Sequence, residues 1–168
     1  MGLAHNGVMT GELFLSHSTK KLAQMTGLIE TCARKLDADQ IWNRGGDTQN
    51  SIGNLVLHLC GNVRQWIGWS IGGMPDIRER ELEFAASSKT EATELLARLH
   101  GTVNEAISIL EHFPPERLTE RVPTQDGEQS ALEVIYQVVG HFQQHTGQII
   151  FATKMMTGED LKFYKKSP

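Results

Sequence analysis

The sequence predicts an all-α protein built as an antiparallel four-helix bundle. Four segments place apolar residues at alternating spacings of three and four, which is the period of a helix with one buried face. No segment has the alternation of apolar and polar residues, bounded by turn residues, that is typical of strands. We therefore expect a single domain over residues 1–168, with helices at about 10–37, 51–72, 89–113 and 130–156.

The first helix is predicted by an apolar stripe that runs from Leu15 to Leu36. Only Ser18 interrupts this stripe, and the charged side chains of the segment fall off it. The stripe ends before residues 38–50, which contain a Gly-Gly-Asp turn signal and little periodicity. We interpret that segment as a joint between two helices.

The second helix is expected to begin after Ser51, because serine is a favoured N-cap residue and an apolar stripe starts at Ile52. This stripe continues to Trp66, and a Gly-Gly pair just ahead of Pro75 ends the helix. The segment that follows is long and charged, which indicates a second joint.

The third and fourth stripes span residues 92–113 and 131–150. Pro114 follows the third stripe directly, and proline cannot continue a helix. It opens a joint over residues 114–129 that holds three prolines and a glycine. The fourth stripe then gives the last helix.

The composition is that of a globular protein with a mild negative charge. The 168 residues are 39% apolar and 21% charged, with a formal net charge of −4. The absence of a basic block argues against binding to nucleic acid or to an anionic membrane. No apolar run approaches the roughly 18 residues of a spanning helix, and the first residues lack the pattern of a signal peptide. With only two cysteines and no metal-binding spacing between them, we expect a cytoplasmic protein.

Two histidines, four residues apart, interrupt the apolar stripe of the fourth helix in the stretch GHFQQHTGQI. On a helix His141 and His145 lie on one face about 6 Å apart, which lets them share a metal ion at roughly 2.1 Å from each nitrogen. Seven histidines in 168 residues give such a pair about 0.3 times by chance. The pair alone leaves two interpretations open: metal ligands, or core histidines with ordinary hydrogen-bond partners.

His58 is the third candidate ligand, because it lies in the most apolar segment of the chain, between two leucines. Taken alone, it is more simply a core histidine bonded to a backbone carbonyl. Together with His141 and His145 it gives three nitrogen ligands from two helices and leaves a position for water or substrate, as catalytic metal sites do. The sequence therefore predicts an open metal site at these three residues.

Three stretches of the sequence carry a family resemblance that extends over about residues 12–164. They are NSIGNLVLHLCGNVRQWI, GGMPDIRERELEF and YQVVGHFQQHTGQIIFATKMMTGEDLKFY. With the three histidines, they resemble an uncharacterised subgroup of the DinB-like (DinB/YfiT) superfamily of metal-binding four-helix bundle proteins. The resemblance implies an up-down-down-up bundle with a long crossover, and a metal bound by His58, His141 and His145.

The same resemblance implies a chemistry and a set of partners. Relatives with assigned chemistry are transferases or isomerases that depend on a low-molecular-weight thiol. Their metal is usually zinc or nickel, and dimers are common among them. We therefore expect a divalent transition metal, a homodimer, and transfer of a thiol to a small electrophilic substrate. A non-catalytic metal-binding protein of the stress response and a metal-dependent hydrolase stay open as alternatives, so whether the protein is an enzyme is undecided by the sequence.

Five further side chains have roles that the sequence leaves open. Arg78 and Arg80 follow the second helix and either clamp a substrate carboxylate or, as we favour, pair with the glutamates beside them, Glu79, Glu81 and Glu83. Gln148, one turn beyond His145, and Gln144, one turn beyond Gly140, are both candidates to orient a ligand. His17 lies beside the gap in the first stripe, from where it would approach a central site.

The histidine-bearing stripes offer no carboxylate that is well placed as a general base. Glu133 precedes His141 by two turns but is expected toward the end of the bundle. Cys60 lies about 200° from His58 around the helix, so we do not expect it to act as a nucleophile in the same site. This favours a thiol transferase, in which the metal activates the thiol, over a hydrolase that needs a base beside its water.

Overall fold

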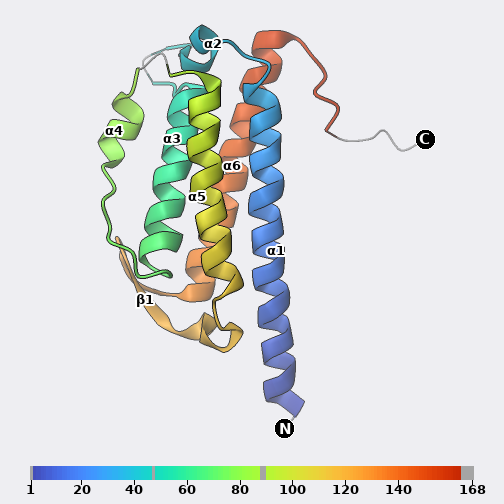
Figure 1. Cartoon of the computed structure of the whole chain (residues 1–168), viewed down its shortest axis with the longest axis vertical. Helices are drawn as coiled ribbons and strands as arrows, with labels where there is room; N and C mark the ends of the chain where they lie inside the picture. Colours follow the sequence, from blue (N-terminus) through green and yellow to red (C-terminus); the bar gives the residue numbers. More distant parts are fainter. Residues whose placement is uncertain (1, 47, 88–89, 164–168) are drawn as a thin grey trace, which may run out of the picture.

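Four long helices make up most of the protein and lie side by side in the computed structural model (Figure 1). The structure describes residues 2–46, 48–87 and 90–163, with side chains from residue 7 onward. The predicted all-α class is confirmed, although the first helix starts earlier and ends sooner than expected. The long helices are α1 (Gly2–Ala33), α3 (Ile52–Val63) with its π-helical continuation η1 (Arg64–Trp69), α5 (Ala92–Glu111) and α6 (Ala131–Thr157).

The apolar stripes of these helices meet in one core, since α1 packs against α5 and α6, and α3 packs against α5 and α6 as well. Burying each large aliphatic or aromatic side chain contributes roughly 1.5–3 kcal/mol to stability. Ser18 is buried where it interrupts the first stripe, and its hydroxyl donates to the carbonyl of Phe14 at 2.7 Å, so it leaves no unpaired donor. Fully buried members of the core include Leu22, Ile29, Leu59, Leu99, Ile135 and Phe142.

Capping boxes fix the first residues of α3 and α6. The hydroxyl of Ser51 accepts from the backbone N–H of Asn54 at 3.1 Å, and the Asn54 side chain accepts from the backbone N–H of Ser51 in return. Ser130 and Glu133 make the same pair of bonds at the start of α6. Each such cap contributes about 1 kcal/mol. Glu133 therefore lies at the start of α6 and so toward one end of the bundle, as the sequence predicts.

The joints contain short elements that the sequence pattern does not predict. The expectation that the chain has no strands was wrong, because the third joint contains an antiparallel hairpin in which Thr124 pairs with Gly127. Gly127 has a φ of 107°, a conformation that favours glycine. Among the described helices, none combines the length and the apolar character needed to cross a membrane. The short elements are α2 (Ala38–Trp42), α4 (Arg80–Ala85), η2 (Pro115–Thr119), β1 (Arg121–Thr124) and β2 (Gly127–Ser130).

Candidate metal centre

The three histidines predicted from the sequence lie together between α3 and α6. His58 comes from α3, whereas His141 and His145 come from successive turns of α6. One ring nitrogen of each histidine lies within 4.8 Å of the other two. The rings stand edge to face, with centroids 4.4 to 5.1 Å apart. His17 is not part of this histidine cluster, since it is exposed on α1.

The geometry of the histidine cluster fits a transition metal ion. Nε2 of His58 and Nε2 of His141 are 2.9 Å apart. Two tetrahedral ligands at zinc distances would lie about 3.4 Å apart, so a small outward shift would admit an ion. Burial is the main cause that lowers the pKa of His141 to about 4, and it also lowers the pKa of His145. These two rings are therefore neutral at pH 7, the form that binds metals.

The second ring nitrogens of two cluster histidines are held by oxygen acceptors. Nδ1 of His58 lies 2.9 Å from Oε2 of Glu83, and Nδ1 of His145 lies 2.7 Å from Oε1 of Gln148. We assign the protons of these bonds to the Nδ1 atoms, because an ionised carboxylate and an amide oxygen only accept. Nη2 of Arg78 lies 3.1 Å from Nδ1 of His58 as well, and with this assignment it donates to Oε2 of Glu83 and not to the ring. The Nε2 atoms of His58 and His145 are then unprotonated, and Nε2 of His141 donates to Nε2 of His58. Carboxylate and amide partners of this kind orient histidine ligands in metal sites, and the expected contact of Gln148 is present.

Glu83 is the carboxylate that the sequence analysis did not assign to the site. Its side chain is buried, and the Arg78 guanidinium donates to Oε1 at 2.8 Å and to Oε2 at 2.9 Å. Burial raises the pKa of Glu83, but the hydrogen bonds from Arg78 and His58 outweigh it and the pKa is lowered. Glu83 is therefore ionised. Arg78 also donates to Gln65 at 2.9 Å, and Gln65 donates to Asp76 at 2.9 Å, so a chain of bonds continues away from the cluster.

The pairing of Arg78 with Glu83 confirms the preference for local ion pairs in this segment, although Glu79, one of the expected partners, pairs with neither arginine among the described residues. Arg80 pairs with Glu81 at 3.6 Å and lies over the ring of Phe84, 4.9 Å from its centroid. Within the described part of the chain, both arginines thus have partners that belong to the protein.

Two residues of α3 fix the position of Glu83. The side-chain amide of Asn54 donates to the backbone carbonyls of Glu83 at 2.9 Å and of Ala86 at 2.8 Å, which ties α4 to the start of α3. Gly61 lies one turn beyond His58, and the Glu83 carboxylate occupies the space above it. A Cβ atom at position 61 would be 1.8 Å from Oε1 of Glu83. The contact between Glu83 and His58 therefore depends on a glycine at this position.

An open groove of about 520 Å³ lies along α6 and reaches the histidine cluster at His141. Apart from Tyr136, the other residues along the groove are polar or small: Gln129, Glu133, Gln137, Gly140 and Gln144.

Cys60 lines a different cavity, one that none of the cluster histidines lines, in agreement with its predicted position away from the cluster. Burial raises the pKa of Cys60 to about 11.

The helical fold and the histidine cluster are those of a DinB-like protein. Over residues 9–165 the sequence matches the family described as "Protein of unknown function (DUF1572)", which is a DinB-like family. The chain belongs to this family, and the resemblance seen in the sequence is confirmed. None of the functionally curated proteins matches the sequence.

Solved structures share the fold at low sequence identity. A DinB-like protein, YjoA from Bacillus subtilis, is 16% identical with a TM-score of 0.67, over 89% of this chain and 98% of that one. The mycothiol-dependent maleylpyruvate isomerase is 14% identical with a TM-score of 0.63, and a histidine-to-alanine variant of that isomerase has a TM-score of 0.60. Both isomerase matches cover 80% of this chain but 60% of theirs. Identities this low establish the fold alone.

Proposed function

We propose that His58, His141 and His145 bind one divalent transition metal ion, and that the protein uses it to transfer a low-molecular-weight thiol to a small electrophile. One observation carries this proposal: the nitrogens of all three histidines converge within 4.8 Å. The outward nitrogens of two of them are held by Glu83 and Gln148. The thiol is supported by a fold neighbour, the mycothiol-dependent isomerase.

The roles of the residues follow from their contacts. A bound ion would supply Lewis-acid activation of a thiol at neutral pH. His58, His141 and His145 would each offer one ring nitrogen to the ion, while Glu83 and Gln148 keep the Nδ1 protons of His58 and His145 in place. Three such ligands would leave room for a substrate at the ion.

The bonding of Glu83 favours a transferase over a hydrolase. Both of its carboxylate oxygens accept hydrogen bonds from Arg78, and one also contacts His58. A group that is already ionised and fully engaged is a poor base for a water molecule. A thiol needs no such base, because a nearby cation lowers its pKa directly.

The groove along α6 supports access for a small molecule from the side of His141. Its volume of about 520 Å³ is in the range of small-molecule sites. Gln137 and Gln144 line it with side-chain amides, which suit a polar substrate or the polar part of a thiol. We place the electrophile in this groove.

Thiol-dependent turnover tests the proposal. Purified protein loaded with zinc or nickel should consume a reactive electrophile only when a thiol is present, and a chelator should abolish the reaction. His141→Ala should remove metal and turnover, while His112→Ala, which alters an exposed histidine at the end of α5, should change neither. Consumption with water alone would favour the hydrolase. Stoichiometric metal without turnover for any thiol and electrophile would favour the non-catalytic alternative.

We also propose the finer fold that the resemblance implies, a single-domain up-down-down-up bundle with a long crossover. The helix contacts support it, since α1 and α6 pack together and α3 and α5 pack together. The homodimer, the cytoplasmic location and the choice between zinc and nickel stay predictions of the sequence.

A further inference from the structure

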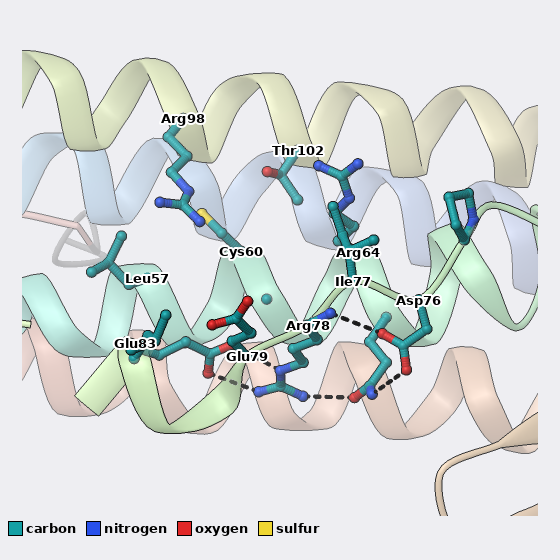
Figure 2. A pocket seen from close by; sticks show the side chains of 14 residues that line it. Leu57, Cys60, Arg64, Asp76, Ile77, Arg78, Glu79, Glu83, Arg98 and Thr102 are labelled. Carbon is teal, nitrogen blue, oxygen red and sulfur yellow. Dashed lines mark hydrogen bonds and ion pairs between the residues drawn. The ribbon is translucent and has the colours of Figure 1, made fainter. Parts of the chain in front are cut away.

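A second cavity, of about 400 Å³, lies between α3, η1, α5 and the segment over residues 75–83 (Figure 2). Glu83 and Arg78 line this cavity, whereas none of the cluster histidines does. Because Glu83 also contacts His58, its ion pair with Arg78 forms a wall between the cavity and the histidine cluster. The proposed metal chemistry does not use this second cavity.

Two exposed arginines line the cavity. Arg98 lies on α5 and Arg64 is the first residue of η1, and Figure 2 shows both side chains on the side of the cavity where Thr102 lies. Within the described residues, neither guanidinium makes a hydrogen bond or an ion pair. The opposite wall differs, since Arg78, Glu83 and Asp76 are bonded to one another or to Gln65. Arg64 and Arg98 are thus free to bind an anion.

Apolar side chains make up another part of the lining. Leu57 lies on α3, and Ile77 and Leu82 come from the segment that covers the cavity. Ile77 is 62% exposed and Leu82 is 61% exposed. Large apolar side chains beside unpaired arginines are the composition expected where a ligand has both an anionic group and an apolar body.

We propose that this cavity binds a small organic monocarboxylate with an apolar body. The carboxylate pairs with Arg64 and Arg98, for which planar, bidentate recognition is typical, and the hydroxyl of Thr102 is available as a further donor. The apolar body lies against Leu57, Ile77 and Leu82. The volume of about 400 Å³ is in the range of small-molecule pockets.

Glu79 sets the preference for a single negative charge. It lines the same cavity, and within the described residues its carboxylate makes no hydrogen bond or ion pair. A ligand with a second anionic group would meet this carboxylate and be repelled. Removing the charge with Glu79→Gln should therefore strengthen the binding of a monocarboxylate.

Calorimetric titration with benzoate tests the site, with benzamide as the uncharged control of the same shape. We expect saturable binding of benzoate and none of benzamide. Arg64→Gln and Arg98→Gln should each weaken binding by at least about tenfold, since a charge-assisted bond is lost. Arg34→Gln is the matched control, because Arg34 is an exposed helical arginine on α1 that pairs with Glu30 away from the cavity. Equal binding by all three variants, or no binding by the unaltered protein, overturns the proposal.

The metal-free His141→Ala protein separates this site from the metal site, because a carboxylate also binds metal ions. We expect this variant to bind benzoate as well as the unaltered protein does. Methyl resonances of Leu57, Ile77 and Leu82 should shift on titration. Loss of binding in His141→Ala, or shifts confined to methyl groups outside the cavity, would place benzoate elsewhere and contradict the inference. The expected binding of benzoate does not depend on whether the metal proposal is correct.

Discussion

The histidine cluster and the second cavity lie on either side of one ion pair, yet their polar groups are organised in opposite ways. In the cluster, Glu83 and Gln148 fix the outward nitrogens of two histidines. In the cavity, Arg64 and Arg98 have no bond that fixes their guanidinium groups within the described residues. A metal ion requires ligands at set distances, so its site is held by a surrounding shell. Long, unpaired arginines instead adapt to an organic ligand at the cost of ordering their side chains.

The difference is sharpest at Glu83, which takes part in both regions. Its Oε2 atom contacts His58 on one side, and its ion pair with Arg78 lines the cavity on the other. Disturbing this residue should impair the preorganised cluster strongly, because one histidine loses its orientation. It should impair the adaptable cavity less, because Arg64 and Arg98 do not depend on it.

Glu83→Gln should have the largest effect. Removing one partner of a buried ion pair costs about 3 kcal/mol, measured as a lower free energy of unfolding in urea. Loss of a carboxylate behind a histidine ligand typically weakens metal affinity about 10- to 100-fold, measured by titration with Co²⁺ and its visible absorption. Glu81→Gln is the control, because its pair with Arg80 is exposed and its loss should change stability by less than about 1 kcal/mol. Unchanged Co²⁺ affinity in Glu83→Gln would show that Glu83 does not orient His58.

Gly61→Ala should have the second-largest effect, because the new side chain displaces the same Glu83 carboxylate. The new methyl group would be 1.8 Å from Oε1 of Glu83 and would force this side chain away from His58. Although alanine favours a helix by about 1 kcal/mol over glycine, the displaced ion pair and the overpacking should give a net loss of about 1–3 kcal/mol.

Gly101→Ala provides the matched comparison on α5, because a Cβ atom there would meet nothing within 4 Å apart from its chain neighbours and the backbone of its own helix. It should stabilise the protein by up to about 1 kcal/mol. Equal changes in the free energy of unfolding for the two alanine variants would mean that Glu83 does not occupy the space above Gly61.

The smallest expected effect concerns the two cysteines, Cys32 and Cys60. Neither should react with an alkylating reagent in the native protein near pH 8. Burial raises the pKa of Cys60 to about 11 and also raises the pKa of Cys32, so their thiolates are scarce. Iodoacetamide labelling followed by mass spectrometry should modify both cysteines in urea and neither in buffer. Rapid labelling of Cys60 in buffer would contradict its burial.

The same burial makes the stability of the protein depend on pH. Because the folded-state pKa of Cys60 lies above its value in the unfolded chain, the contribution of this thiol to stability is complete below pH 9 and is lost as the pH rises toward 11.

The sequence predicts that the three histidines come together better than it predicts the residues around them. His141 and His145 can be placed on one face because helix period fixes side chains four residues apart, and the apolar neighbours of His58 indicate its burial. Glu83 comes from a segment without periodicity, and its position depends on distant contacts with Asn54 and Gly61. No local pattern encodes those contacts.

The sequence pattern does not predict the hairpin of β1 and β2, for a related reason. Its strands have four residues each, too few for an alternating pattern to stand out. The Asp-Gly pair at positions 126 and 127 is a hairpin signal that points to the turn, but little apolar sequence flanks it.

Metal analysis of tag-free purified protein tests the central claim most directly, because every proposed step of the chemistry depends on the histidine cluster. The account predicts about one equivalent of a divalent transition metal per chain, either as purified or after reconstitution and removal of free metal. Less than about 0.2 equivalents, with no uptake on reconstitution, would contradict the assignment of His58, His141 and His145 as ligands.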